Sequence, residues 1–123
     1  MTKPTYQDTT ILLHLMQMSI MAGLSKAMNW MWSDQFILDY NNFINKYPVG
    51  GEEYGKFSKI CGHYETIGTL WKHKLINEEL LFDWLAVDII WNRVKEVALG
   101  VRQESGEPRL FENFEAMAKA ATV

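Results

Sequence analysis

The amino-acid sequence predicts an all-α protein, a single antiparallel bundle of about five helices. Along most of the chain, apolar side chains recur at intervals of three and four residues, which is the period of an amphipathic helix. The three prolines lie outside or at the edges of these periodic segments, so they leave room for long helices: Pro4, Pro48 and Pro108. No segment alternates apolar and polar residues in the way that a half-buried strand does.

The first predicted helix runs from about Asp8 to Trp32. A break or kink is expected between Ser19 and Gly23, because glycine weakens a helix interior by about 1 kcal/mol relative to alanine. The apolar positions that define this helix are Ile11, Leu12, Met16, Ile20, Leu24, Ala27, Met28 and Met31.

Two helices are predicted in the middle of the chain. Ser33 is expected to cap a helix that ends near Tyr47, with Trp32 and Ile37 packing across the cap. The following helix begins near Glu52, after the segment "YPVGG". Its apolar stripe consists of Phe57, Ile60, Cys61, Tyr64, Ile67, Gly68 and Trp71.

Two more helices complete the predicted bundle. Asn77 is expected to cap a long helix from Glu78 to about Gln103. Gly106 is expected to stop that helix, and Pro108 to occupy the first turn of the last one. Short connections make consecutive helices antiparallel neighbours, so residues 1–123 are expected to form one domain.

Composition excludes several classes of protein. The formal net charge of the 123 residues is −3, which gives no positive field to attract nucleic acid. The only cysteine is Cys61, so an internal disulfide and a multi-cysteine zinc site are excluded. This cysteine usage, together with a start that does not resemble a secretory signal, predicts a cytoplasmic protein.

The segment "ILLHLMQMSIMAGLSKAMNWMW" is the first candidate for a functional surface. Polar residues interrupt it too often for a membrane span, which needs about 18 apolar residues in succession. It can form part of the core, a ligand groove, or a subunit interface in a homodimer or with a protein partner. The interface hypothesis rests on a row of small residues and on adaptable methionines: Ser19, Gly23, Ala27, Met28 and Met31.

A second candidate site centres on Asp88. Helical spacing places it in an apolar stripe beside Trp84 and Trp91, where a carboxylate must be hydrogen-bonded, paired with a cation or neutralised. One alternative is a structural carboxylate, bonded to Arg93, Tyr64 or a nearby cap. The other is a polar anchor in an apolar ligand pocket that Trp71, Trp84 and Trp91 line.

Catalytic and metal-binding patterns are lacking in the sequence. The three histidines, His14, His63 and His73, do not have the spacing of ligands that converge on one helix face. Cys61 and His63 are two residues apart, so a helix points them in different directions. The sequence therefore predicts no catalytic residue, no metal ligand and no cofactor.

A set of packing and capping residues forms a recognisable pattern in the chain: Leu75, Ile76, Glu79, Leu80, Asp83, Trp91, Pro108, Arg109, Leu110 and Phe114. On these positions, the stretch from about Asp34 to Met117 resembles an uncharacterised family of small, mostly bacterial helical domains of unknown function. The segment "DYNNFINKY", from Asp39 to Tyr47, also matches this family. The resemblance implies a helical fold and supplies no catalytic residues. Many members carry an N-terminal transmembrane helix ahead of the domain, which this chain is expected to lack.

These observations predict a non-enzymatic helical interaction domain that acts by self-association or by binding a protein partner. The alternative is a helical bundle that binds a small molecule in the tryptophan-lined pocket.

Overall fold

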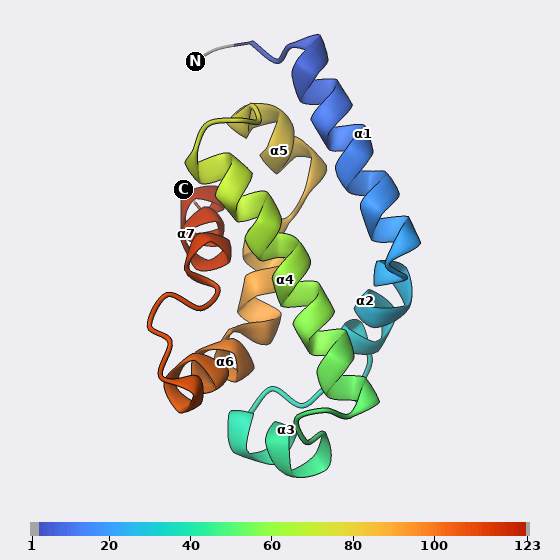
Figure 1. Ribbon diagram of the computed structural model, residues 1–123, viewed down its shortest axis with the longest axis vertical. Coiled ribbons are helices and arrows are strands. Elements are labelled where there is room, and N and C mark those ends of the chain that lie inside the picture. Colours follow the sequence, from blue (N-terminus) through green and yellow to red (C-terminus); the bar gives the residue numbers. More distant parts are fainter. Residues whose placement is uncertain (1–2, 123) are drawn as a thin grey trace.

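The computed structural model describes residues 3–122, which form seven α-helices and no strand (Figure 1). The prediction of an all-α protein is therefore confirmed. The predicted number of about five helices is wrong, because two of the long predicted helices are each divided in two. The helices are α1 (Tyr6–Met21), α2 (Leu24–Trp32), α3 (Tyr40–Lys46), α4 (Glu52–Lys72), α5 (Glu78–Trp84), α6 (Val87–Ser105) and α7 (Glu112–Ala121).

The helices are arranged around α4, and the predicted antiparallel bundle is seen only in part. α1 runs along one side of α4 in the opposite direction, and α6 and α7 lie on the other side (Figure 1). α4 makes its most extensive contacts with α7 and also packs against α2. The short helices α3 and α5 lie at the two ends of the molecule and do not extend the bundle (Figure 1).

The expected break in the first helix is present. α1 ends at Met21, α2 begins at Leu24, and the two helix axes differ by 77°. Gly23 has a φ of 70°, in the left-handed region that costs glycine little, so it allows this sharp change of direction. The bend sends α2 into contact with α4.

Ser33 does not begin a helix, which corrects the prediction. Its hydroxyl donates to the carbonyl of Trp30 and accepts from the N–H of Gln35, so it ends α2 and starts a turn. The N-cap of α3 is Asp39, whose carboxylate accepts from the N–H of Asn42 at 2.9 Å. Serine is favoured in both roles, and its type alone does not decide between them.

The long helix predicted from Glu78 to Gln103 is also divided. Asn77 caps α5 as expected, accepting from the N–H of Leu80 at 2.9 Å. The helix then stops after Trp84, because Leu85 adopts an extended conformation with a ψ of 130°. A new helix, α6, begins at Val87 although neither glycine nor proline lies at this break.

The end of the chain follows the prediction at one position and departs from it at another. Gly106 ends α6 in the left-handed conformation, as expected, with a φ of 73°. Pro108 lies in a series of turns and does not open the last helix, which begins only at Glu112. The residue before that helix, Phe111, has a φ of 60°, which is unusual for a side chain of its size.

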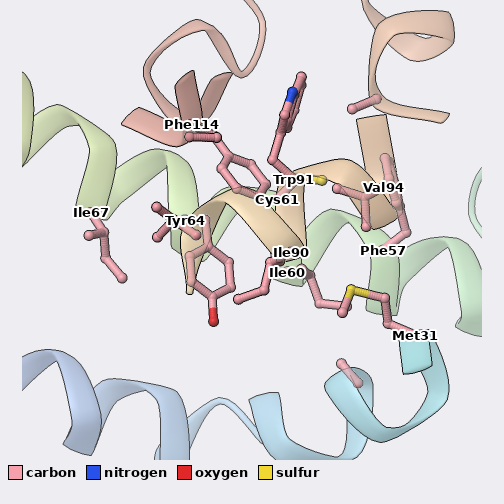
Figure 2. Close-up of a cluster of buried hydrophobic side chains, with 14 of the residues drawn as sticks. Met31, Phe57, Ile60, Cys61, Tyr64, Ile67, Ile90, Trp91, Val94 and Phe114 are labelled. Atoms are coloured by element: carbon pink, nitrogen blue, oxygen red, sulfur yellow. The ribbon is translucent and has the colours of Figure 1, made fainter. Parts of the chain in front are cut away.

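The core lies between α4, α6, α7 and α2. Figure 2 shows Phe57, Tyr64 and Phe114 among the side chains that fill it. The ring of Phe114 stacks on Tyr64 and meets the edge of Trp91, with centroid distances of 5.3 and 5.0 Å. No polar or charged residue among those that the structure describes is fully buried, so the interior is an apolar one.

Polar side chains connect distant segments at the edge of this core. Arg93, on α6, donates to the carbonyls of Met31 and Ser33 at 2.8 and 2.9 Å and so holds the end of α2. Its guanidinium also lies 5.3 Å from the ring centroid of Phe36. These contacts fix the direction of the chain as it leaves α2.

Candidate functional site

α1 is the helix with the most exposed apolar surface. Only Leu15 of its sixteen residues is buried. Large apolar side chains on the same helix remain in solvent, with Ile20 exposed at 75% and Met21 at 79%. A concentration of large exposed apolar side chains on one helix is typical of a binding surface. The other exposed apolar side chains of α1 are Tyr6, Leu13, Met16 and Met18.

Contacts with the body of the protein and the bend at Gly23 hold α1 in position. At its N-terminal end, Thr5 and Asp8 form a reciprocal capping box. The other carboxylate oxygen of Asp8 accepts from the N–H of Asn77 at 2.8 Å, which links α1 to the start of α5. Leu15 packs inward from the middle of α1, so the helix presents one side to the body of the protein and the other to solvent.

The pKa of Asp8 is lowered by these contacts. The hydrogen bond from the N–H of Thr5 has the largest effect and the bond from Asn77 adds to it, while desolvation acts in the opposite direction. The Asp8 carboxylate therefore stays charged and keeps both hydrogen bonds down to acidic pH.

The five residues proposed for an interface fall in three environments. Ala27 and Met31 are buried in the protein's own core, exposed at 1% and 0%. Ser19 and Met28 are half-buried, and Gly23 is exposed at the bend. The exposed apolar surface therefore lies on α1, and the five residues predicted for the interface do not form a common exposed surface.

The residues of the proposed tryptophan pocket lie in separate surroundings. Trp91 is in the core, packed against Phe114. Trp71, near the end of α4, is half-buried and donates from its indole Nε1 to the Glu78 carboxylate at 3.0 Å. Trp84 ends α5, and Asp88 lies half-buried in the first turn of α6, where a negative charge suits the helix dipole.

A surface hollow of about 750 Å³ lies between the N-terminal segment and the joint of α4 with α5. Trp71 is one of its walls, whereas Trp84, Trp91 and Asp88 do not line it. Its size is that of a small-molecule site. The charged side chains that line it have both signs: Lys3, Lys72, Lys74, Asp8, Glu78 and Glu79.

The remaining titratable side chains form no recognisable catalytic arrangement. Cys61 is fully buried, and burial raises the pKa of its thiol, so little reactive thiolate forms. Both carboxylate oxygens of Glu65 are occupied by Asn113 and Phe114 of α7. Among residues 3–122, no group of three or more His, Cys, Asp or Glu side chains is placed to hold a metal ion.

No single helix in the described part of the chain is long and apolar enough to cross a membrane. α1 and α2 reach that length and composition only together, and they are bent at 77°.

Comparison with known proteins gives a family and no activity. Among curated proteins and among solved structures, no match was found. One family model, described as a domain of unknown function (DUF4760), matches residues 4–121. This match confirms the resemblance to an uncharacterised family of helical domains, and the chain belongs to the DUF4760 family.

Proposed function

We propose that this protein is a non-enzymatic interaction domain that self-associates through α1. One observation carries the proposal: α1 has a single buried residue, Leu15, and a series of large apolar side chains in solvent. A monomer gains nothing from this arrangement, because apolar surface left in water costs about 25 cal/mol per Å² relative to burial.

The composition of α1 supports a protein partner. Three of its exposed apolar side chains are methionines, which adapt their shape to an opposing surface: Met16, Met18 and Met21. The net charge of −3 argues against nucleic acid as the partner. The buried, unreactive Cys61 fits the reducing cytoplasm, where we place the domain.

Self-association can be tested by native mass spectrometry and by size-exclusion chromatography with light scattering over a hundredfold range of concentration. We expect a dimer whose fraction rises with concentration. A triple variant, Leu13→Ser, Ile20→Ser and Met21→Ser, should remain monomeric, because it removes exposed apolar area without touching the core. The matched control is Val49→Ser with Leu99→Ser, which changes exposed apolar side chains elsewhere and should leave the dimer intact. A wild-type chain that stays monomeric at every concentration would contradict the proposal.

A second candidate function is the binding of a small molecule in the hollow beside Trp71. The volume of about 750 Å³ and the fixed indole of Trp71 support it. Native mass spectrometry of freshly purified protein should then show extra mass that is lost on denaturation. The variant Trp71→Ala should retain less of that mass, whereas Trp84→Ala, outside the hollow, should retain it in full. If the freshly purified wild-type protein carries no extra mass, this candidate function is excluded.

A further inference from the structure

The outward side of α1 carries a regular stripe of five exposed residues. Their positions are separated by four, three, four and three residues, which is the heptad spacing of a coiled-coil contact. On a helix this stripe lies opposite Leu15, the residue that packs into the body. We call it the outer seam, and it consists of Tyr6, Thr10, Leu13, Gln17 and Ile20.

We infer that the outer seam packs against the outer seam of a second copy of this chain, so that two α1 helices form the dimer contact. The inference rests on the proposed function and adds to it the surface and the partner. A seam with 3.5-residue spacing is complementary to another helix, because each side chain fits between four residues of the facing helix.

The absence of charge on the seam favours a second copy as the partner. No Asp, Glu, Lys or Arg occurs in the sequence from Thr9 to Ser25. A symmetric contact places the same patch of each subunit against itself, so a charged patch would repel its counterpart. The one acidic residue of α1, Asp8, lies toward the body, where its carboxylate accepts from the N–H of Asn77.

Thr10 and Gln17 make a helix a better partner than a lipid surface. They alternate with Tyr6, Leu13 and Ile20 along the seam. Between two helices, their side chains can hydrogen-bond across the contact, as polar residues at core positions of coiled coils do. In the hydrocarbon of a bilayer the Gln17 amide would be unpaired, whereas the Thr10 hydroxyl already donates to the carbonyl of Tyr6 at 3.1 Å. α1 also has no lysine or arginine to attract anionic lipid.

The seam also sets the strength of the contact. A helix of sixteen residues is about 24 Å long, which corresponds to little more than two heptads. Such a short contact belongs with weak, reversible interfaces. Each α1 is already held in helical form by its own subunit, through Leu15 and the Asp8–Asn77 hydrogen bond, so the ordering cost of a free peptide is avoided.

Sedimentation velocity on the whole chain tests the seam directly. Leu13→Asn with Ile20→Asn alters the seam, and Met16→Asn with Met18→Asn alters exposed apolar positions beside it on the same helix. We expect the seam variant to raise the dimer dissociation constant at least tenfold, and the flanking variant to change it by less than threefold. Circular dichroism should show both variants folded, because all four side chains are solvent-exposed.

Disulfide trapping identifies the facing residues. Leu13 is the midpoint of the seam, so two fully overlapping seams bring the two Leu13 side chains close together, face to face in a parallel pair and in adjacent layers in an antiparallel one. The variant Leu13→Cys should therefore cross-link under mild oxidation, whereas Met18→Cys should not. The native Cys61 is buried and does not interfere.

The outcomes separate this inference from the proposed function. A monomeric wild type contradicts both. A dimer that the seam and flanking variants weaken equally, or one trapped through Met18→Cys, leaves self-association in place and overturns the seam. Flotation of the wild type, but not of the seam variant, with phosphatidylcholine vesicles would make lipid the occupant of the seam and would also overturn the inference.

Discussion

At Gly68 the backbones of α4 and α7 approach too closely for any side chain. A Cβ atom there would lie 2.6 Å from the backbone carbon and oxygen of Asn113. We expect Gly68→Ala to reduce the free energy of unfolding by about 1–3 kcal/mol, the usual cost of overpacking, despite the better helix propensity of alanine. Urea unfolding at 25 °C measures this change. Gly62→Ala, on the same helix with open space around it, should instead stabilise the protein by up to about 1 kcal/mol.

Single residues were predicted well where the signal is local. The burial of Cys61 and the cap formed by Asn77 follow from helical period and residue type, and both predictions are confirmed. Glu65 and Arg93 could not be assigned in this way. Their partners, Asn113 and Met31, are 48 and 62 residues away in the sequence. Only the folded chain brings such groups together.

At the scale of one element, α7 depends on a side chain from another helix. No side chain of its own caps its N-terminus. Instead, one carboxylate oxygen of Glu65 accepts from the N–H groups of Asn113 and Phe114 at 3.0 and 2.9 Å. This arrangement places both a hydrogen-bond acceptor and a negative charge at the start of α7, where each is stabilising.

Removing that carboxylate should destabilise the protein through α7. We expect Glu65→Ala to cost about 1–3 kcal/mol in urea unfolding, because two partly buried N–H groups lose their acceptor. Glu65→Gln keeps an oxygen acceptor and should cost less. Amide hydrogen exchange should be faster in Glu65→Ala than in the wild type, and the increase should be largest in α7. The control is Glu96→Ala, an exposed position on α6. Equal effects of Glu65→Ala and Glu96→Ala would show that the cap contributes little.

Helix existence was easier to predict than helix boundaries. Gly23 and Gly106 are visible in the sequence as breaks, and both have the left-handed conformation. The break at Leu85 has no such signal, since local propensity there favours a continuous helix. It is set by packing: Leu81 before the break and Val87 after it are both fully buried. Tertiary contact therefore overrides a sequence that reads as one helix.

At the scale of the whole molecule, the sequence could not separate core from interaction surface. Both need apolar residues at helical spacing, so α1 and α2 appeared as one equivalent stretch. The bend at Gly23 places the two helices in different environments: Met31 of α2 is buried at 0% exposure, and Met21 of α1 is exposed at 79%. The candidate site therefore became visible only when the direction of each helix was known.

Global stability should depend on pH through His63. This side chain is half-buried, and burial lowers its pKa from the ordinary value of about 6.5. As pH falls below that value, the unfolded chain binds a proton that the folded chain does not yet bind, so the free energy of unfolding decreases. The decrease continues until pH reaches the pKa of His63 in the folded protein. Above about pH 7 His63 is neutral in both the folded and the unfolded chain, so it no longer changes the free energy of unfolding with pH.

We therefore expect the urea midpoint of the wild type to fall between pH 7.5 and pH 5.5, at a concentration where the chain is monomeric. His63→Gln should show a smaller fall, because the glutamine takes up no proton in that range. His14→Gln, at an exposed position on α1, is the matched control and should behave as the wild type does. Asp8 does not affect this range. Because its pKa is lowered, its contribution to the free energy of unfolding is present above about pH 4 and is lost only at more acidic pH. An unchanged slope in His63→Gln would assign the pH dependence to groups other than His63.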